Sequence, residues 1–410
     1  MGSNVEILIN TYQHLRYVAW RFQITAIQFN IPATIIVGGG ASDEVGAQAK
    51  RLGVKNALLV TDSYMENSGL AGRIADCIRR ADVNVIVYSG VQPDPTNQNV
   101  HEGLEILKKN SCGMVVGLGG GSPMDCAKAI SAMSANQPPM SRYAGLHKVH
   151  YKGVPIITIP TTAGTGAEVT KVVVIGETRR NVKMMILDIN LMADVALVDY
   201  QLTMTCPPAL TANVGVDTLV HAVEAYVSVK ANPMTDPYAL SSIKHVSRNL
   251  LKAYREPSNA QVREGMTLAA LQAGIAFPNS SVCLVHGMSR PVGALFHVPH
   301  GLSNAVLFPT VTEFSIKGAT GRYATVSRAM GYATVGDPVD IANEKLVAGL
   351  KKLNQDLQIP RLGEVCKVDQ ATFDENVLKM ATDSLASGSP DNNPVIPTAQ
   401  QIVDLYHRAW

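Results

Sequence analysis

The chain has 410 residues, enough for one large α/β unit or two domains, and 46% of them are hydrophobic and 17% charged. This composition is typical of a soluble globular protein with a sizeable core. Lys and Arg number 35 against 33 Asp and Glu, and the net charge of +2 gives no reason to expect a nucleic-acid or membrane partner. No apolar stretch approaches the roughly 20 residues that span a bilayer, and MGSNVEILIN shows no signal peptide. Six cysteines without a C-x-x-C pair indicate reduced thiols and a cytoplasmic protein.

Residues 1–28 form an N-terminal extension in the predicted organisation. Apolar residues recur there at helical spacing, and residues 22–31 then alternate as a strand would. The helical stripe consists of Val5, Leu8, Tyr12, Leu15, Val18 and Phe22. A helix that must bury this stripe favours a docking surface within a homodimer or larger homo-oligomer. A helix packed on the chain's own core is the alternative.

Residues 29–205 alternate apolar, β-rich runs with helical patterns. The predicted strands are 33–38, 57–62, 83–90, 113–119, 154–160, 171–176 and 195–199, and the helical stretches between them include 42–52, 66–80, 97–109 and 122–136. Continuous apolar strands that alternate with helices are typical of a parallel sheet covered on both faces. After Cys206-Pro207-Pro208 the strand signal almost disappears, so we expect an all-helical domain over 206–410.

A glycine-rich turn over 116–128, VGLGGGSPMDCAK, gives the strongest phosphate-binding signal. A buried strand runs into glycines and then into a helix, with Ser122 as the expected cap, Pro123 at the first helical position and Asp125 bonding back to the cap. Glycines let the backbone approach a ligand, and free N–H groups at a helix N-terminus attract phosphate. A tight turn with a good cap is the alternative.

Two further features point to a nucleotide. Asp62 ends a predicted strand, where a carboxylate accepts bonds from an adenosine ribose and repels a 2′-phosphate, although a surface Asp is an equal alternative. The stretch 159–168, IPTTAGTGAE, places three hydroxyls and two glycines after a strand, where they can bond phosphate or amide oxygens. Hydroxyl-rich turns are also common without a ligand.

Metal ligands are predicted in the helical half. Asp217 and His221 are four residues apart and therefore share a helix face. His286 lies in an apolar helical pattern and His300 in a tight turn. Three imidazoles and one carboxylate can bind a divalent transition metal such as iron or zinc. A lone His in an apolar run is more often a hydrogen-bonded core residue.

Four ordered motifs, GGGSPMDCAK, PTTAGTGAEVT, GVDTLVHAVEAYVS and HGMSRPVGALFHVPHG, carry a resemblance to the iron-dependent (group III) alcohol dehydrogenase family. The resemblance runs from about Phe29 to the C-terminus. It implies a dinucleotide-binding α/β domain with a parallel sheet, an all-helical C-terminal domain, and an active site between them. It also implies that Asp217, His221, His286 and His300 bind the metal, most simply Fe(II), with Zn as the alternative.

For the cofactor NAD, the resemblance implies a site lined by Gly119, Gly120, Gly121, Ser122, Asp125, Thr161, Thr162 and Thr165. Asp62 matches the strand-end residue that favours NAD over NADP in this family. Lys183, in NVKMMI, falls where the family has a lysine near the cofactor. The implied chemistry is metal polarisation of an alcohol oxygen and hydride transfer to nicotinamide.

One departure from the family pattern is Ser289-Arg290, where many members have Ala-His. Arg cannot relay a proton at neutral pH but bonds carboxylate, sulfonate or phosphate groups in pairs. Arg290 therefore predicts a substrate with an anionic or strongly polar end. The alternatives are an ion pair with a nearby acid or a contact with the cofactor pyrophosphate. His297 is a candidate proton relay or substrate contact, with a structural role as the alternative.

We therefore predict an NAD-dependent, metal-dependent dehydrogenase or reductase that acts on a small primary alcohol or aldehyde. A lyase or synthase of the dehydroquinate synthase type, which uses NAD transiently, is the alternative within the same fold. A binding protein that has lost catalysis is the alternative from another class.

Overall fold

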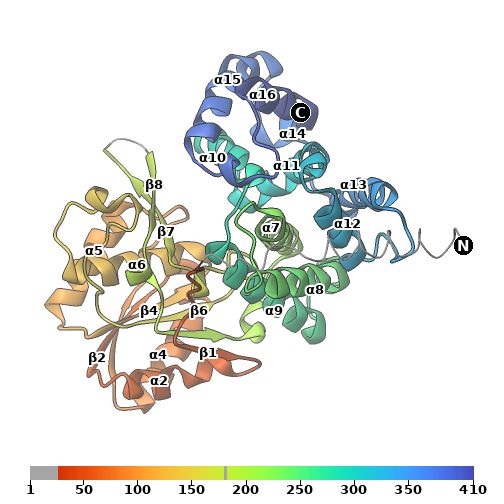
Figure 1. The fold of residues 1–410 in the computed structure, drawn as a ribbon. Helices are drawn as coiled ribbons and strands as arrows, with labels where there is room; N and C mark the ends of the chain where they lie inside the picture. The colour runs from red at the N-terminus through yellow and green to blue at the C-terminus, as the bar shows by residue number, and fades with distance from the viewer. Residues whose placement is uncertain (1–25, 180–181) are drawn as a thin grey trace, which may run out of the picture. The chain divides into compact units, whose positions relative to one another are not determined.

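The computed structural model describes residues 26–179 and 182–410 (Figure 1). Contacts divide the chain into two units, Met1–Asn30 and Ile31–Trp410, and every helix and strand described below belongs to the second. The helix predicted for the N-terminal extension lies outside the described residues. Residues 26–31 have no regular secondary structure, so the strand expected over 22–31 is wrong in its described part.

The first half of the second unit is built on a six-stranded sheet with the order β1-β9-β6-β4-β2-β3. All of its neighbouring strands are parallel. The strands are β1 (Thr34–Val37), β2 (Asn56–Val60), β3 (Asn84–Tyr88), β4 (Met114–Gly119), β6 (Ile156–Pro160) and β9 (Val195–Val198). β2, β4, β6 and β9 are nearly continuous runs of buried residues, as a sheet covered on both faces requires.

Helices cover both faces of this sheet. They are α2 (Val45–Arg51), α3 (Ser63–Asn67), α4 (Leu70–Arg80), α5 (Asn97–Lys109) and α6 (Gly121–Ala135). Leu58 and Val60 of β2 belong to the hydrophobic cluster formed with α5 and α6, whereas Ala57 and Leu59 belong to the cluster formed with α2 and α4. Because successive strand residues point to opposite faces, each face has its own core.

A second sheet has three strands, of which the sequence analysis predicted one. It contains β5 (Gly145–Leu146), β8 (Val182–Leu187) and β7 (Val172–Glu177), in the order β5-β8-β7. The strand predicted over 171–176 exists as β7, but it pairs antiparallel with β8 and does not join the main sheet. The sequence analysis missed β8, because Lys183 and two methionines give it a weak strand pattern.

The second half is helical throughout, which confirms the predicted fold class. Its helices are α7 (Pro208–Val227), α8 (Asp236–Arg255), α9 (Ala260–Ala276), α10 (Leu284–Phe296), α11 (His300–Ser315), α12 (Thr320–Ala329), α13 (Val339–Asp356), α14 (Leu362–Cys366), α15 (Gln370–Ala386) and α16 (Ala399–Ala409). The domain boundary near residue 205 stays a prediction. Within the described residues no single helix has the length and apolarity to cross a membrane; α9 with its extension to Asn279 and α10 pass that test only as a pair bent by 101°.

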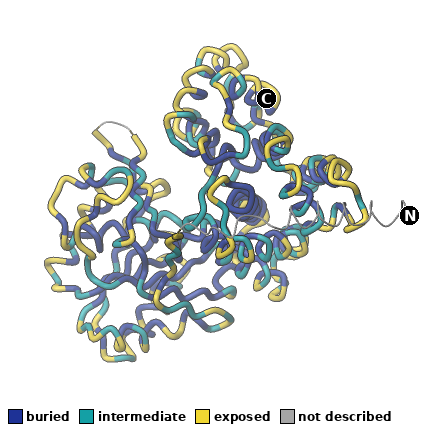
Figure 2. The backbone as a smooth tube through the Cα atoms, in the orientation of Figure 1, coloured by how far each residue is buried: buried dark blue, intermediate teal, exposed yellow. Residues whose placement is uncertain are grey.

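Helix α7 is the central element of this half. Every residue from Gly215 to Val227 is buried (Figure 2), and α8, α9 and α11 pack around it. A helix that is apolar on all sides is stable only inside a core. Any polar side chain on this helix must therefore find its partner within the protein.

Candidate metal and cofactor site

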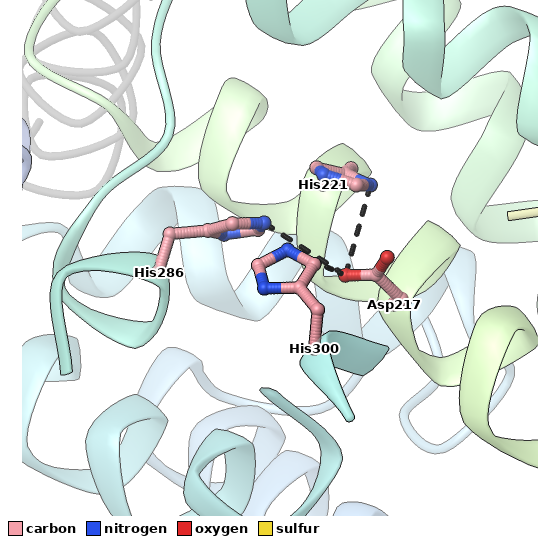
Figure 3. A group of neighbouring side chains, drawn as sticks. All are labelled: Asp217, His221, His286 and His300. Atoms are coloured by element: carbon pink, nitrogen blue, oxygen red, sulfur yellow. Dashed lines mark ion pairs between the residues drawn. The ribbon is translucent and has the colours of Figure 1, made fainter. Parts of the chain in front are cut away.

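Four side chains from three helices meet at one point: Asp217 and His221 on α7, His286 on α10 and His300 at the start of α11 (Figure 3). One ligand atom from each lies within 4.8 Å of those of the others. Asp217 Oδ1 is 3.9 Å from His221 Nδ1, 3.8 Å from His286 Nε2 and 3.9 Å from His300 Nε2. The structure thus brings together the four residues predicted as ligands.

Local geometry explains why the two distant histidines arrive here. His297 ends α10 with a left-handed backbone (φ 55°), and Pro299 takes the N-cap position of α11, so only a short turn separates the two helices. α11 then lies directly against α7. A Cβ built on Gly301 would lie only 2.8 Å from the Asn213 carbonyl oxygen, so this close approach depends on the glycine. The glycine therefore sets His300 beside Asp217.

The cluster is buried on one side and open on the other. The side chains of Asp217, His221 and His286 are at most 6% exposed, whereas that of His300 is 48% exposed. Phe277 stacks on the His221 ring with 4.4 Å between centroids and covers that side. A substrate can therefore approach most easily past His300.

Glu224, which the sequence analysis missed, fixes the orientation of His286. Its Oε2 lies 2.6 Å from His286 Nδ1 and accepts the backbone N–H of Cys283 at 2.8 Å, while Oε1 accepts the N–H of Val285 at 2.7 Å. A carboxylate on Nδ1 holds the proton there and leaves the Nε2 lone pair facing the cluster. The signal was present, since residues 217, 221 and 224 are spaced four and three apart on one helix face.

The donor atoms fit a cation. His221 Nδ1 is buried without a hydrogen-bond partner, and burial lowers the pKa of this imidazole to about 4, so it is neutral and offers a lone pair. Asn304, also missed from sequence, places its amide nitrogen 2.7 Å from Asp217 Oδ1 and 3.2 Å from both His286 Nε2 and His300 Nε2. A partly positive N–H group thus lies beside three of the four acceptor atoms. One carboxylate and three neutral imidazoles suit Fe(II) or Zn.

The glycine turn and the threonine loop lie side by side because β4 and β6 are neighbours in the sheet. Thr161 N–H donates to the Gly119 carbonyl at 3.0 Å. A Cβ on Gly121 would meet Thr165 Cγ2 at 3.2 Å, and Gly119 has φ +141° with Pro123 2.7 Å from a Cβ built there. Position 119 therefore requires glycine, and the space beside Gly121 is tight. The three glycines of the turn and the three threonines of the loop therefore lie together at the carboxyl ends of β4 and β6.

The predicted capping of α6 is wrong. Gly120 is the N-cap and no side chain bonds there, so Ser122 lies inside the first turn. Asp125 Oδ2 accepts the backbone N–H of Val174 in β7 at 2.9 Å and does not reach back to the cap. Thr161 Oγ1 is buried without a partner. The start of α6 and this hydroxyl are thus free to bond a ligand, which suits a dinucleotide phosphate.

Other predicted residues are more scattered. Asp62 follows β2, the neighbour of β4, and caps α3 through the N–H of Met65 at 2.9 Å. Lys183, on β8, forms an exposed ion pair with Asp94 at 2.8 Å. His297 is exposed at the end of α10. The roles predicted for these three residues stay predictions.

Comparison with known proteins agrees with this geometry. Residues 32–200 match the model of the iron-containing alcohol dehydrogenase family, and residues 211–410 match that of its C-terminal domain. The NAD-dependent methanol dehydrogenase of Bacillus methanolicus is 35% identical over 93% of this chain and 99% of its own length. The crystal structure of a 1,3-propanediol oxidoreductase superposes with a TM-score of 0.91, 34% identity, and coverage of 94% of this chain and 100% of that one.

A third relative is a sulfoacetaldehyde reductase from Bifidobacterium kashiwanohense, solved in complex with NAD+. It superposes with a TM-score of 0.84 at 30% identity, covering 94% of this chain and 99% of that one. These matches confirm the family that the four motifs predicted. The chain belongs to the iron-containing alcohol dehydrogenase family.

Proposed function

We propose that this protein is a metal-dependent oxidoreductase that transfers hydride between NAD(H) and a small primary alcohol or aldehyde. The single observation that carries the proposal is the convergence of Asp217, His221, His286 and His300 within 4.8 Å on the buried helix α7 and its neighbours. The relatives support the substrate class, since their names specify methanol, 1,3-propanediol and sulfoacetaldehyde.

The residues have distinct tasks in this reaction. When bound, the metal polarises the substrate oxygen and NAD carries the hydride. Asp217 contributes the one negative charge among the ligands, Glu224 keeps the His286 lone pair directed inward, and Phe277 covers the face of His221. The exposed side of the ligand cluster, at His300, leaves room for the carbinol carbon of the substrate.

The α/β half holds the cofactor in this proposal. Backbone N–H groups at the start of α6 bind the pyrophosphate, and the unpaired Thr161 hydroxyl adds a donor. The remaining lining residues are Gly119, Gly120, Gly121, Ser122, Asp125, Thr162 and Thr165. Asp62, at the end of β2, favours NAD through its charge.

The lyase alternative has less support, because the named relatives are dehydrogenases or reductases. We also propose a cytoplasmic homo-oligomer. All six cysteines are free and buried, which agrees with a reducing compartment.

The test is an absorbance assay of NADH with a panel of primary alcohols, diols and ω-hydroxy acids, using protein loaded with Fe(II) or Zn. Steady formation of NADH with at least one alcohol is expected, together with the reverse reaction on its aldehyde. A loaded enzyme that turns over a cyclic polyol phosphate without net NADH formation would instead establish the lyase alternative.

A further inference from the structure

Arg290 joins the two halves of the chain next to the metal ligands. Its Nη1 donates to the hydroxyl of Ser389 at 2.9 Å, and its Nη2 lies 4.0 Å from the sulfur of Met185 on β8. It follows His286 by one helical turn on α10. Side chains four apart on a helix lie on the same face, with Cβ atoms about 5–6 Å apart.

The Arg290 guanidinium makes fewer hydrogen bonds than are expected for a half-buried arginine. The residue is half-buried, and within the described part of the chain it pairs with no carboxylate. Glu224 is the acid that acts on it electrostatically, but both Glu224 oxygens are already occupied by Cys283, Val285 and His286. One hydroxyl and one sulfur leave most of its five N–H donors unused. A cation partly removed from water is favoured when an anion completes its hydrogen bonds.

The positive charge of Arg290 also lies close to the metal ligands. Arg290 follows the ligand His286 by four residues on α10, so both side chains lie on the same face of the helix. Arg290 therefore lies within electrostatic reach of a metal ligand. The phosphate-binding N–H groups, by contrast, belong to the start of α6 in the α/β half. Arg290 also touches the α/β half, through Met185 on β8, so its place one helical turn after a metal ligand is what favours the substrate as its partner.

We infer that Arg290 binds a terminal carboxylate or sulfonate on a short aldehyde or alcohol whose reacting oxygen lies at the His286–His300 cluster. The inference rests on the proposed function and narrows its substrate class. A planar guanidinium fork matches two oxygens of such an anion, which a histidine at this position does not. The separation of about one helical turn suits a chain of roughly two to four carbons.

The test uses the metal-loaded full chain with NADH and matched aldehydes: succinic semialdehyde against 4-methylpentanal, and sulfoacetaldehyde against 3,3-dimethylbutanal. Each pair exchanges an anion for an apolar group of similar shape. Wild type should prefer the anionic member, and Arg290→Met should reduce the anionic-to-neutral ratio of kcat/KM by about 30-fold or more. Arg290→Lys should retain part of the preference. Arg248→Met, an exposed arginine on α8, serves as the control and should leave the ratio unchanged.

Three outcomes overturn the inference: wild type that prefers the neutral aldehydes, equal loss on both members of a pair, or a raised KM for NADH without a change in the ratio. The last would assign Arg290 to the pyrophosphate. If wild type reduces no aldehyde, the proposed function fails, and calorimetric binding of isethionate to the metal-loaded protein tests Arg290 separately. There, a 30-fold weaker Kd for Arg290→Met supports the anion site and an unchanged Kd refutes it. If Arg290→Met does not fold, Arg290→Lys carries both comparisons.

Discussion

The two halves of the chain build their polar sites in different ways. In the helical half, side chains from α7, α10 and α11 converge, and some of their atoms have no protein partner, as His221 Nδ1 and Asn304 Oδ1 show. In the α/β half, glycines and backbone N–H groups form most of the surface, and the Thr161 hydroxyl is its one side-chain group described above as unpaired. Further along α6, the buried Lys128 donates to the carbonyls of Ala167 and Thr170 and to the Thr170 hydroxyl, which accounts for all three of its N–H groups.

Buried polar atoms without a protein partner are candidates for ligand binding, whereas fully hydrogen-bonded ones support the fold. Unpaired buried polar atoms are costly, so a cluster that keeps them is expected to gain its partner from outside the chain. A buried ammonium with several oxygen partners is complete without one. We therefore expect changes in the helical cluster to act on metal binding and catalysis, and changes around Lys128 to act on stability.

The largest effect is expected for His286→Ala. Removing one of four ligands leaves an incomplete, misoriented site, so metal content should fall below stoichiometric and kcat/KM should drop by at least about a hundredfold. Elemental analysis and the NADH assay measure both quantities. His245→Ala, on α8 outside the cluster, is the control. Wild-type metal occupancy with retained turnover would remove His286 from the site.

A smaller effect on metal binding is expected for Glu224→Gln. The amide cannot hold the His286 Nδ1 proton as the carboxylate does at 2.6 Å, and it directs N–H groups at the backbone donors of Cys283 or Val285. Second-sphere changes of this kind typically cost 10–100-fold in metal affinity, so competition with a chelator should show about that loss. Glu264→Gln, an exposed change on α9, should have no effect. Equal affinities for Glu224→Gln and wild type would assign Glu224 to folding alone.

The buried Lys128 tests the other half of the comparison. Lys128→Met leaves the oxygens of Ala167 and Thr170 without their donor, which should reduce the free energy of unfolding by about 1–3 kcal/mol. Metal affinity should stay unchanged. Denaturant titration measures the first and chelator competition the second, with the exposed Lys244→Met as control. A loss of metal affinity without a loss of stability would contradict the division between the two halves.

The difference in stability between wild type and Lys128→Met should also depend on pH. Burial lowers the pKa of Lys128 to about 8 from an ordinary 10.5, against the opposing charges of Asp125 and Glu168. Between these values the unfolded chain binds the proton and the folded chain does not, so unfolding takes up a proton and wild-type stability gains as pH rises. The stability difference between wild type and Lys128→Met should therefore widen from about pH 8 towards 10, by at most about 1.4 kcal/mol per pH unit. A difference that stays constant or narrows over this range would show that Lys128 remains protonated.

Local spacing predicted only part of the helical site, and the assignment of His286 and His300 came from the family resemblance. Asp217 and His221 are four apart on one helix, and such spacing fixes a shared face before any tertiary structure is known. Glu224 was overlooked although it continues the same spacing, and Asn304 was overlooked because an amide in an apolar helix resembles a buried polar core residue. Their roles depend on which atoms of other helices they meet.

Predictions failed where long-range contacts decide. Ser122 and Asp125 have the sequence of a capping motif, but Gly120 takes the cap and Asp125 bonds Val174 in a strand about 50 residues away. β7 has a strong strand pattern, yet nothing in that pattern shows that it pairs with β8 and leaves the main sheet. Local propensity sets the type of element, and tertiary pairing sets its neighbours.

The smallest effect is expected for Asp62→Asn. Asp62 caps α3 through the N–H of Met65, so replacement by alanine would combine lost charge with a lost cap worth about 1 kcal/mol. Asparagine keeps an oxygen that can accept the same N–H and removes only the charge, and stability should change by less than about 0.5 kcal/mol.

If Asp62 repels the 2′-phosphate of NADP, its neutralisation should raise the NADP-to-NAD ratio of kcat/KM by about tenfold, since one charge at about 4 Å is worth roughly 1–4 kcal/mol at and near a surface. The effect should shrink in high salt, because an exposed charge pair is screened. Asp43→Asn, an exposed acid in the turn after β1, is the matched control. An unchanged ratio at low salt would place Asp62 outside the cofactor site and leave it only the role of helix cap, which the structure already shows.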